Sequence, residues 1–122
     1  MDARTLARLQ ALGRVVIGAG LALAPARTGG AWIGSDARRP ATQVAIRAFG
    51  ARDLAIGLGA ASAAGRGHGA GPWLRAGVLA DAADLAATLR AREHLPPLAV
   101  AGVGALAAGS ALLGLWLSRE LD

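Results

Sequence analysis

Charged side chains interrupt stretches of this sequence that are otherwise apolar, and their types suit ion pairing or proton transfer. The segment AIRAFGARDLAIGLGAASAA, residues 45–64, contains Arg52 and Asp53, while Arg14 lies in the apolar residues 6–24. All 13 basic residues are arginines, and a guanidinium group stays protonated when it is buried. An arginine within an apolar element needs a partner, so each embedded charge is a candidate functional residue.

Counting along the chain places these charges at one depth. Measured from the prolines that bound the neighbouring loops, Arg14, Arg52 and Asp84 lie 11, 12 and 12 residues into their segments. At a helical rise of about 1.5 Å per residue, each would lie roughly 18 Å from its loop, near the middle of a bilayer about 30 Å thick. The counts predict a buried ionic layer of two arginines, three aspartates and one serine: Arg14, Arg52, Asp53, Asp81, Asp84 and Ser110.

The predicted layer has a structural and a functional interpretation. Fully paired charges would fix which helices meet and in which register, a known role of buried polar groups. On this basis we expect an integral membrane protein that serves as an accessory or interaction subunit. The alternative is a small proton- or ion-coupled transporter, in which Asp81 or Asp84 exchanges its arginine partner for a proton or a substrate. A dry, fully paired layer would favour the first interpretation, and a water-filled cavity that reaches Asp81 would favour the second.

Other kinds of chemistry are not predicted. The sequence contains no G-x-S-x-G elbow, P-loop, H-E-x-x-H or Rossmann fingerprint, so we do not expect an enzyme. Asp81 and Asp84 lie near arginines and would make a poor cation site. His68 and His94 lie in loop sequences without a second histidine at ligand spacing, so no metal or haem cofactor is expected. The arginines are scattered rather than interleaved with aromatic residues, which argues against nucleic-acid binding.

The elements that must carry these residues are predicted to be membrane-spanning helices. The chain is 54% apolar and 17% charged, with a mean hydropathy of +0.44, whereas a water-soluble domain is about a quarter charged. Residues 95–118 contain no charged side chain and exceed the roughly 20 residues needed to cross the hydrocarbon. We expect an all-α fold, an integral membrane four-helix up-down bundle in one transmembrane domain, residues 1–122, with helices at about 6–24, 41–64, 73–91 and 95–118.

Two segments allow alternatives. Residues 25–40, PARTGGAWIGSDARRP, mix glycine, proline and charges, and we expect a loop in which Trp32 and Ile33 dip into the interface. The arginine-rich start of the chain and the apolar run after it resemble a cleavable signal peptide. Pro25 would adjoin the cleavage site, however, and Arg14 has predicted partners, so we expect the first helix to be retained.

Small residues recur every four positions on two of the predicted helices. These stripes are Ala51, Ala55, Gly59 and Ala63 on one helix, and Ala101, Ala105 and Gly109 on another. Such faces allow helix backbones to approach closely within a bilayer. Besides the lipid bilayer itself, the expected partners are therefore a second copy of the chain, in a homo-oligomer, or a larger membrane complex.

Two short motifs carry a resemblance to known proteins. The first is G-R-x-x-x-G and the second is G-x-R-D-x-x-x-G, formed by Gly13, Arg14 and Gly18, and by Gly50, Arg52, Asp53 and Gly57. In these motifs the sequence resembles a group of small, uncharacterised four-helix membrane proteins of high-GC actinobacteria, loosely related to the DoxX-like membrane proteins. The resemblance implies the four-helix fold and a multi-pass protein of the bacterial inner membrane. DoxX-like proteins are associated with redox subunits and accessory roles. This chain has no haem or quinone ligand pattern, however, so no cofactor is expected.

The arginines outside the apolar segments give little information on orientation. With four spans, both termini lie on one side together with residues 65–72, and that side carries four loop arginines against five on the other. The positive-inside rule discriminates poorly between such similar counts. We expect a weakly specified orientation, with a slight preference for termini outside the cytoplasm.

Overall fold

The computed structural model of the protein describes every residue, Met1–Asp122, and contains helices and no strand. Five α-helices follow one another along the chain: α1 (Ala3–Leu23), α2 (Pro25–Ile33), α3 (Pro40–Arg66), α4 (Ala70–Arg90) and α5 (Pro97–Glu120). Two short 3-10 turns, Gly34–Arg38 and Arg92–His94, precede α3 and α5. The all-α class expected from the sequence is confirmed.

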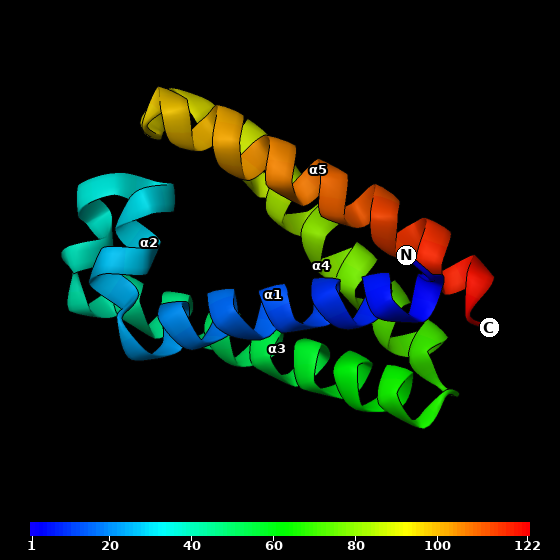
Figure 1. Ribbon diagram of the computed structural model, residues 1–122. Coiled ribbons are helices and arrows are strands. Elements are labelled where there is room, and N and C mark those ends of the chain that lie inside the picture. Colours follow the sequence, from blue (N-terminus) through cyan, green and yellow to red (C-terminus); the bar gives the residue numbers. More distant parts are fainter.

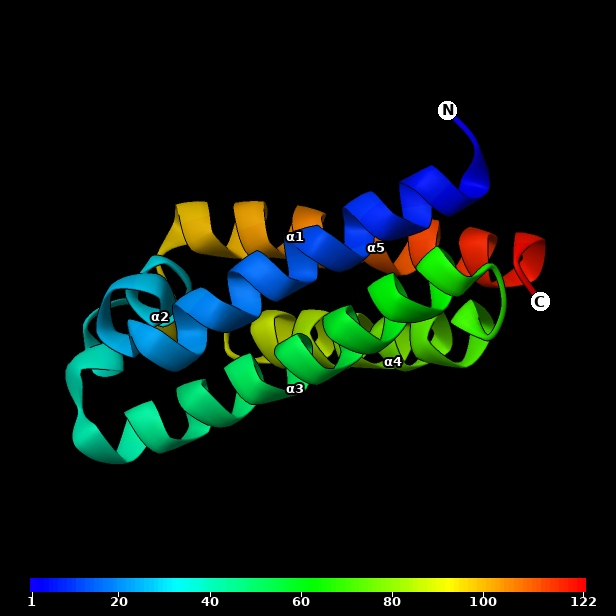
Figure 2. The same cartoon turned by 60° about the horizontal axis from the view of Figure 1, so that its bottom comes forward.

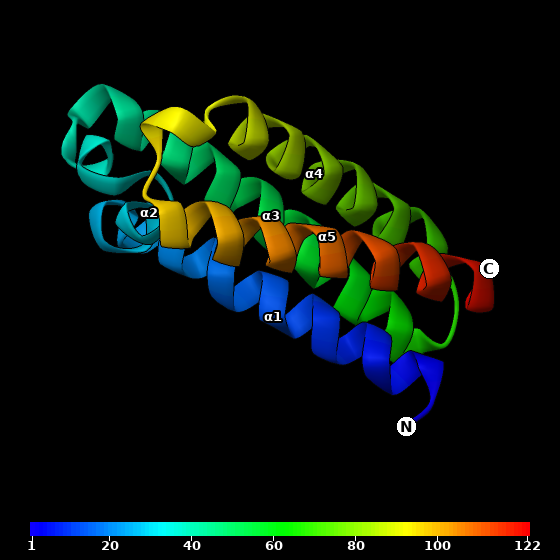
Figure 3. The same cartoon turned by 90° about the horizontal axis from the view of Figure 1, so that it is seen from above.

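The four long helices, α1, α3, α4 and α5, alternate in direction, and both termini lie at the same end (Figures 1 and 3). α1 packs along α3 and α4 packs along α5, while α3 and α4 share a smaller contact. Figure 2 shows α1 and α5 on one side of the molecule and α3 and α4 on the other. α1 and α5 touch each other only over a short stretch, so the molecule consists of two closely packed helix pairs. Each of the four helical ranges predicted from the sequence overlaps one long helix.

Local signals set the helix ends. Three helices begin with proline at the first helical position, where its missing N–H breaks no intrahelical bond: Pro25, Pro40 and Pro97. Asp2 caps α1, since its side chain accepts a hydrogen bond 2.7 Å long from the backbone N–H of Thr5. That hydrogen bond holds the pKa of the Asp2 carboxyl below its usual value. Gly67 follows the last residue of α3 and caps the helix, with a left-handed φ of 82° that favours glycine.

Residues 25–40 differ from the prediction, which placed a loop there. Pro25 begins a further helix, α2, and a 3-10 turn leads from it to α3. The indole Nε1 of Trp32 donates a hydrogen bond of 3.0 Å to Oγ1 of Thr88 in α4. The centre of the Trp32 ring also lies 5.9 Å from the centre of the Phe49 ring in α3. These contacts stabilise a short helix whose two interior glycines, Gly29 and Gly30, disfavour it when only local propensity is considered.

α1 and α3 approach so closely that their backbones are in contact. A Cβ atom added to Gly50 would lie 2.6 Å from both the amide nitrogen of Ala22 and the carbonyl oxygen of Gly18. A Cβ atom on Gly18 would lie 2.7 Å from the carbonyl oxygen of Gly50, and Gly57 is similarly confined. In contrast, a Cβ atom on Gly13 would meet nothing within 4 Å. The glycines at 18, 50 and 57 therefore permit the packing of α1 on α3.

Most of the small-residue stripes predicted for close helix approach face outward. Ala51 and Ala55 of α3 and Ala101, Ala105 and Gly109 of α5 are all exposed. The buried small residues lie on other faces: Gly50, Gly57 and Ala60 on α3, and Gly104, Ala107 and Gly114 on α5. The five exposed positions therefore take no part in helix packing within this chain. Small residues occupy several faces of both helices, so their spacing alone does not identify the face that packs inside the bundle.

The core is small and the surface is unusually apolar. Only 27 of the 122 residues are buried, and most of these are alanine or glycine. Large aliphatic side chains instead face outward on the four long helices, as at Val16, Leu58, Leu79 and Leu112. α1 and α5 are long and apolar enough to cross a membrane, and only 22% of the most apolar window of each is buried.

Candidate functional site

Arg14 projects from α1 towards α3 and α4 and contacts a carboxylate on each. Its Nη1 donates a hydrogen bond of 3.2 Å to Oδ1 of Asp53, and its Nη2 donates one of 2.5 Å to Oδ2 of Asp81. Nη2 also donates to the carbonyl oxygen of Gly77, 3.4 Å away. The Arg14 side chain is only 9% exposed. This single guanidinium group therefore links three helices in a largely buried position.

Gly77 is a site residue that the sequence analysis did not identify. A Cβ atom at this position would lie 3.2 Å from Nη2 of Arg14, so a side chain would crowd the guanidinium group against its partners. Gly77 lies about one helical turn before Asp81, and this spacing was the available signal. The signal is weak because the chain contains 18 glycines.

Arg52 on α3 makes the second set of ionic contacts. Its Nη1 and Nη2 donate to the two carboxylate oxygens of Asp84 on α4, at 3.0 and 2.7 Å. Such a bidentate pair is among the stronger hydrogen-bonded contacts in proteins. Nε and Nη2 also donate to Oδ1 of Asp53, at 3.3 and 3.2 Å. The guanidinium carbon lies 5.4 Å from the centre of the Phe49 ring, close enough for a cation–π attraction.

The ionic network, which we define as Arg14, Arg52, Asp53, Asp81 and Asp84, contains more negative than positive groups. With three carboxylates and two guanidinium groups ionised, its net charge is −1. Both arginines donate to the same oxygen of Asp53, Oδ1, and no protein group donates to Oδ2. Asp81 accepts through Oδ2 only, which leaves its Oδ1 without a donor. The network therefore has unused acceptor atoms as well as excess negative charge.

Ser110 hydrogen-bonds to Gln10 of α1 rather than to the ionic residues with which it was grouped. Nε2 of Gln10 donates to the backbone oxygen of Ser110 at 2.8 Å and to its Oγ at 3.1 Å. The Oε1 atom of Gln10 is buried and has no hydrogen-bond partner. Gln10 is the only amide side chain in residues 6–24, and this was the signal that could have identified it.

A cavity of about 590 Å³ adjoins the ionic network, between α1 and α5. Asp53, Asp81 and Asp84 line it together with Arg14, and aliphatic side chains of α1 and α5 form much of its wall. Ile17 and Leu106 line the cavity and are also 39% and 58% exposed, so the cavity opens outward between these two helices. Figure 1 shows α1 and α5 diverging towards α2, which contributes Thr28, Ala31 and Trp32 to the lining.

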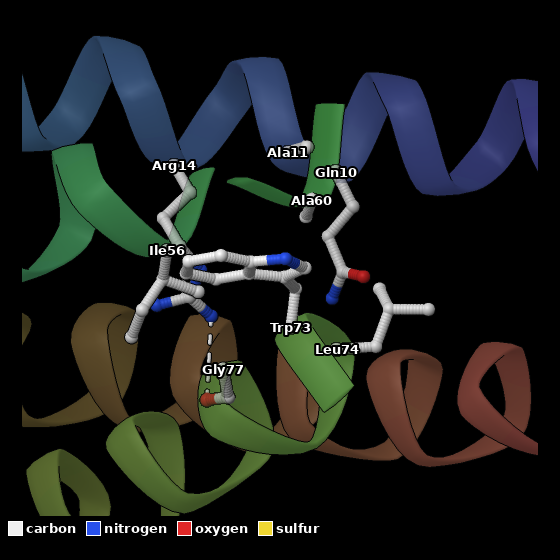
Figure 4. A pocket seen from close by; sticks show the side chains of 8 residues that line it. All are labelled: Gln10, Ala11, Arg14, Ile56, Ala60, Trp73, Leu74 and Gly77. Carbon is white, nitrogen blue, oxygen red and sulfur yellow. Dashed lines mark hydrogen bonds between the residues drawn. The ribbon is translucent and has the colours of Figure 1, made fainter. Parts of the chain in front are cut away.

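A second hollow next to Arg14 is too small for a ligand. Its volume is about 10 Å³, roughly the room that one water molecule requires. Figure 4 shows the Trp73 indole in this hollow near Ile56 and Gln10, and the hydrogen bond from Arg14 to the Gly77 carbonyl. Only the larger cavity has the size of a small-molecule site, typically about 300–1,000 Å³.

Charged residues nearer the helix ends have other partners. Arg47 donates to the carbonyl oxygen of Ala22, and Arg75 pairs with Asp122 near the C-terminus. His68 and His94 are exposed. No group of three or more histidine, cysteine, aspartate or glutamate side chains is arranged to hold a metal ion. The candidate site consequently comprises the ionic network and the cavity beside it.

Comparison with models of known protein families, with curated protein sequences and with solved structures gives no match to this chain. The assignment of a function accordingly rests on the geometry of the ionic network and the cavity.

Proposed function

We propose that the chain is a multi-pass integral membrane protein of the bacterial inner membrane, a four-helix bundle that acts as an accessory binding subunit without catalysis of its own. The main support is the cavity between α1 and α5, which combines an ionic floor with apolar walls. Its mouth is flanked by the exposed side chains of Ile17 and Leu106. A molecule dissolved in the lipid would reach such a mouth directly.

The distribution of polarity supports the membrane position. An unpaired arginine or aspartate at mid-span costs about 2.5–3.5 kcal/mol on translocon scales, but here the embedded charges contact one another and large aliphatic side chains face outward. α3 and α4 contain 27 and 21 helical residues, which at about 1.5 Å each is enough to cross the hydrocarbon. The same pattern on a water-soluble protein would expose an extensive apolar surface.

The lining of the cavity supports binding rather than catalysis. Its hydroxyl groups belong to Thr28 and Ser110, and no histidine lines the cavity to act as a base beside them. The Ser110 hydroxyl oxygen accepts a hydrogen bond from Gln10, which is not a base. The carboxylates are held by arginines, an arrangement that fixes position more readily than it activates a nucleophile.

Single-cysteine variants test the membrane position, because the chain has no cysteine of its own. Leu79 lies within α4 and is 74% exposed on the protein surface, whereas Ser35 is exposed in a 3-10 turn. In open membrane fragments we expect Ser35→Cys to react with a charged maleimide. Leu79→Cys should react only after denaturation in SDS, since lipid covers it. Prompt labelling of Leu79→Cys in the native fragments would contradict membrane insertion.

The same cavity also favours a second function, proton- or ion-coupled transport, because a cavity that reaches Asp81 is the feature expected of the transporter. The cavity reaches Asp81 and Asp84, and the ionic network carries excess negative charge. A carboxylate that releases its arginine and accepts a proton would couple the charge of the network to the occupant of the cavity.

For transport, the informative change is Asp84→Asn. The amide has the shape of the carboxylate and still accepts a hydrogen bond from Arg52, so the fold should persist, but it does not carry a proton. In liposomes with a pH gradient, we expect proton flux from the parent protein and from Asp36→Asn, whose carboxylate lies in an exposed turn. Asp84→Asn should abolish that flux. Equal proton flux from Asp84→Asn and the parent would exclude this carboxylate as the relay. Absence of flux from the parent protein would exclude transport and leave binding as the only proposed function.

A further inference from the structure

We propose that the cavity binds a lipophilic organic cation, namely a protonated amine with one positive charge and an apolar body, in competition with a proton. The inference rests on the proposed binding function and names the class of ligand for the same cavity.

The charge of the ionic network determines the sign of the ligand. Arg14 and Arg52 compensate two of the three charges on Asp53, Asp81 and Asp84, and neither α2 nor α5 adds a charged side chain to the cavity. An uncompensated charge is unfavourable in a medium of low dielectric constant. One monovalent cation or one proton would complete the compensation, whereas an anion would increase the imbalance.

The carboxylate oxygens of the network that accept no hydrogen bond suit a ligand that carries a hydrogen-bond donor. Arg14 and Arg52 already direct their terminal nitrogens to the carboxylates. Oδ2 of Asp53 and Oδ1 of Asp81 accept no hydrogen bond, and both residues line the cavity with side chains that are only 9% and 10% exposed. An ammonium group would donate charge-assisted hydrogen bonds to these oxygens.

The remaining lining requires an apolar body on the ligand. Aliphatic side chains of α1 and α5 line the cavity: Ile17, Leu21, Val103, Leu106 and Leu113. The ring of Trp32 is also part of the lining, and aromatic faces attract organic cations. The volume of about 590 Å³ is far larger than a bare metal ion, and no set of ligating side chains for a metal is present.

A proton competes with the cation for the same excess charge. The titratable groups facing the cavity are Asp53 of α3 and Asp81 and Asp84 of α4, with Arg14 of α1 and Arg52 of α3 as the neighbouring charges. Acidification protonates a carboxylate, removes the net charge of −1 and takes away the site of the ammonium group. Affinity for the cation should therefore fall as the pH is lowered.

Three naphthalene compounds of similar size but different charge test the ligand class. They are 1-naphthylmethylamine, which is cationic at neutral pH, the neutral 1-naphthylmethanol and the anionic 1-naphthoate. Equilibrium dialysis against the purified full-length protein in detergent micelles separates saturable binding from partition into the micelle. We expect saturable binding of the amine only. At a pH low enough to protonate one carboxylate of the network, the affinity for the amine should fall by at least about tenfold, the equivalent of losing one charge-assisted hydrogen bond.

Three variants locate the binding site. Asp81→Asn keeps an acceptor for Arg14 while bringing the network to zero net charge, and should weaken amine binding by at least about tenfold for the same reason. Leu106→Trp fills the cavity from its wall without changing any charge, and should block binding. The matched control, Asp36→Asn, removes a carboxylate whose side chain is 66% exposed and does not line the cavity, and this variant should bind the amine like the parent.

Equal affinity for the amine and the alcohol, or equal binding by the parent and Asp81→Asn, would overturn the cation assignment. Undiminished binding by Leu106→Trp would also overturn it, because the amine would then occupy another place. The cysteine experiment separates this failure from that of the proposed function. Protection of Leu79→Cys without any amine binding would leave the membrane position supported and remove the ligand class only.

Discussion

Replacement of Arg14 by alanine is expected to lower the free energy of unfolding by about 3–5 kcal/mol, the usual effect of removing one partner from a buried ion pair. Asp81 would lose its only hydrogen-bond donor, since Arg52 contacts Asp53 and Asp84 but not Asp81. The variant would also raise the net negative charge of the network in a poorly hydrated place. Thermal unfolding of the purified protein in detergent micelles, followed by tryptophan fluorescence, measures the loss.

The matched control for this prediction is Arg38→Ala. Arg38 is exposed in a 3-10 turn and forms no ion pair, so its removal should leave the unfolding temperature unchanged. The unfolding temperature of Arg52→Ala should lie between those of Arg14→Ala and Arg38→Ala, because the Arg52 side chain is 29% exposed compared with 9% for Arg14. Unfolding of Arg14→Ala at the temperature of the parent would show that the ionic network does not support the fold.

Replacement of Gly50 by alanine is expected to destabilise the protein by about 1–3 kcal/mol, the range for overpacking a close contact. The new Cβ atom would lie 2.6 Å from the backbone atoms of Gly18 and Ala22. Backbone cannot rotate away as the end of a side chain can, so α1 and α3 would have to separate. The same unfolding measurement reports the change.

Gly13→Ala provides a control that should not lower the stability of the protein. A Cβ atom at Gly13 would meet nothing within 4 Å, and alanine is favoured over glycine within a helix by about 1 kcal/mol. We therefore expect Gly13→Ala to be neutral or slightly stabilising, although Gly13 and Gly18 belong to the same sequence motif. Equal destabilisation by Gly13→Ala and Gly50→Ala would contradict the assignment of Gly50 to a backbone contact.

The depth of each residue, meaning its distance along the helix from the nearest loop, was predictable from the sequence. Prolines mark the starts of α2, α3 and α5, and the rise of a helix is nearly constant, so a count of residues from a loop gives a depth. Counting in this way grouped Arg14, Arg52 and the three aspartates, and the hydrogen bonds between them have lengths of 2.5–3.3 Å.

The direction in which each helix faces was not predictable. Ser110 was counted to the depth of the arginines, yet its partner is Gln10, because a count carries no information on rotation about the helix axis. The outward-facing positions of the small-residue stripes have the same cause, since α3 and α5 have alanine and glycine on more than one face. α2 was missed because contacts from Trp32 to residues more than 15 positions away stabilise it, and local propensity does not include such contacts.

The order of the network's partners along the chain has a consequence for its biosynthesis. Arg14, Arg52 and Asp53 are synthesised before the other two members of the network. The network residues of α1 and α3 alone therefore carry a charge of +1. Asp81 and Asp84 follow on α4 and contribute −2. In the proposed membrane setting, α1 and α3 would therefore remain at the translocon or in contact with water until α4 emerges from the ribosome. Partition of α4 into the lipid would then be the step that commits the first half of the protein to the bilayer.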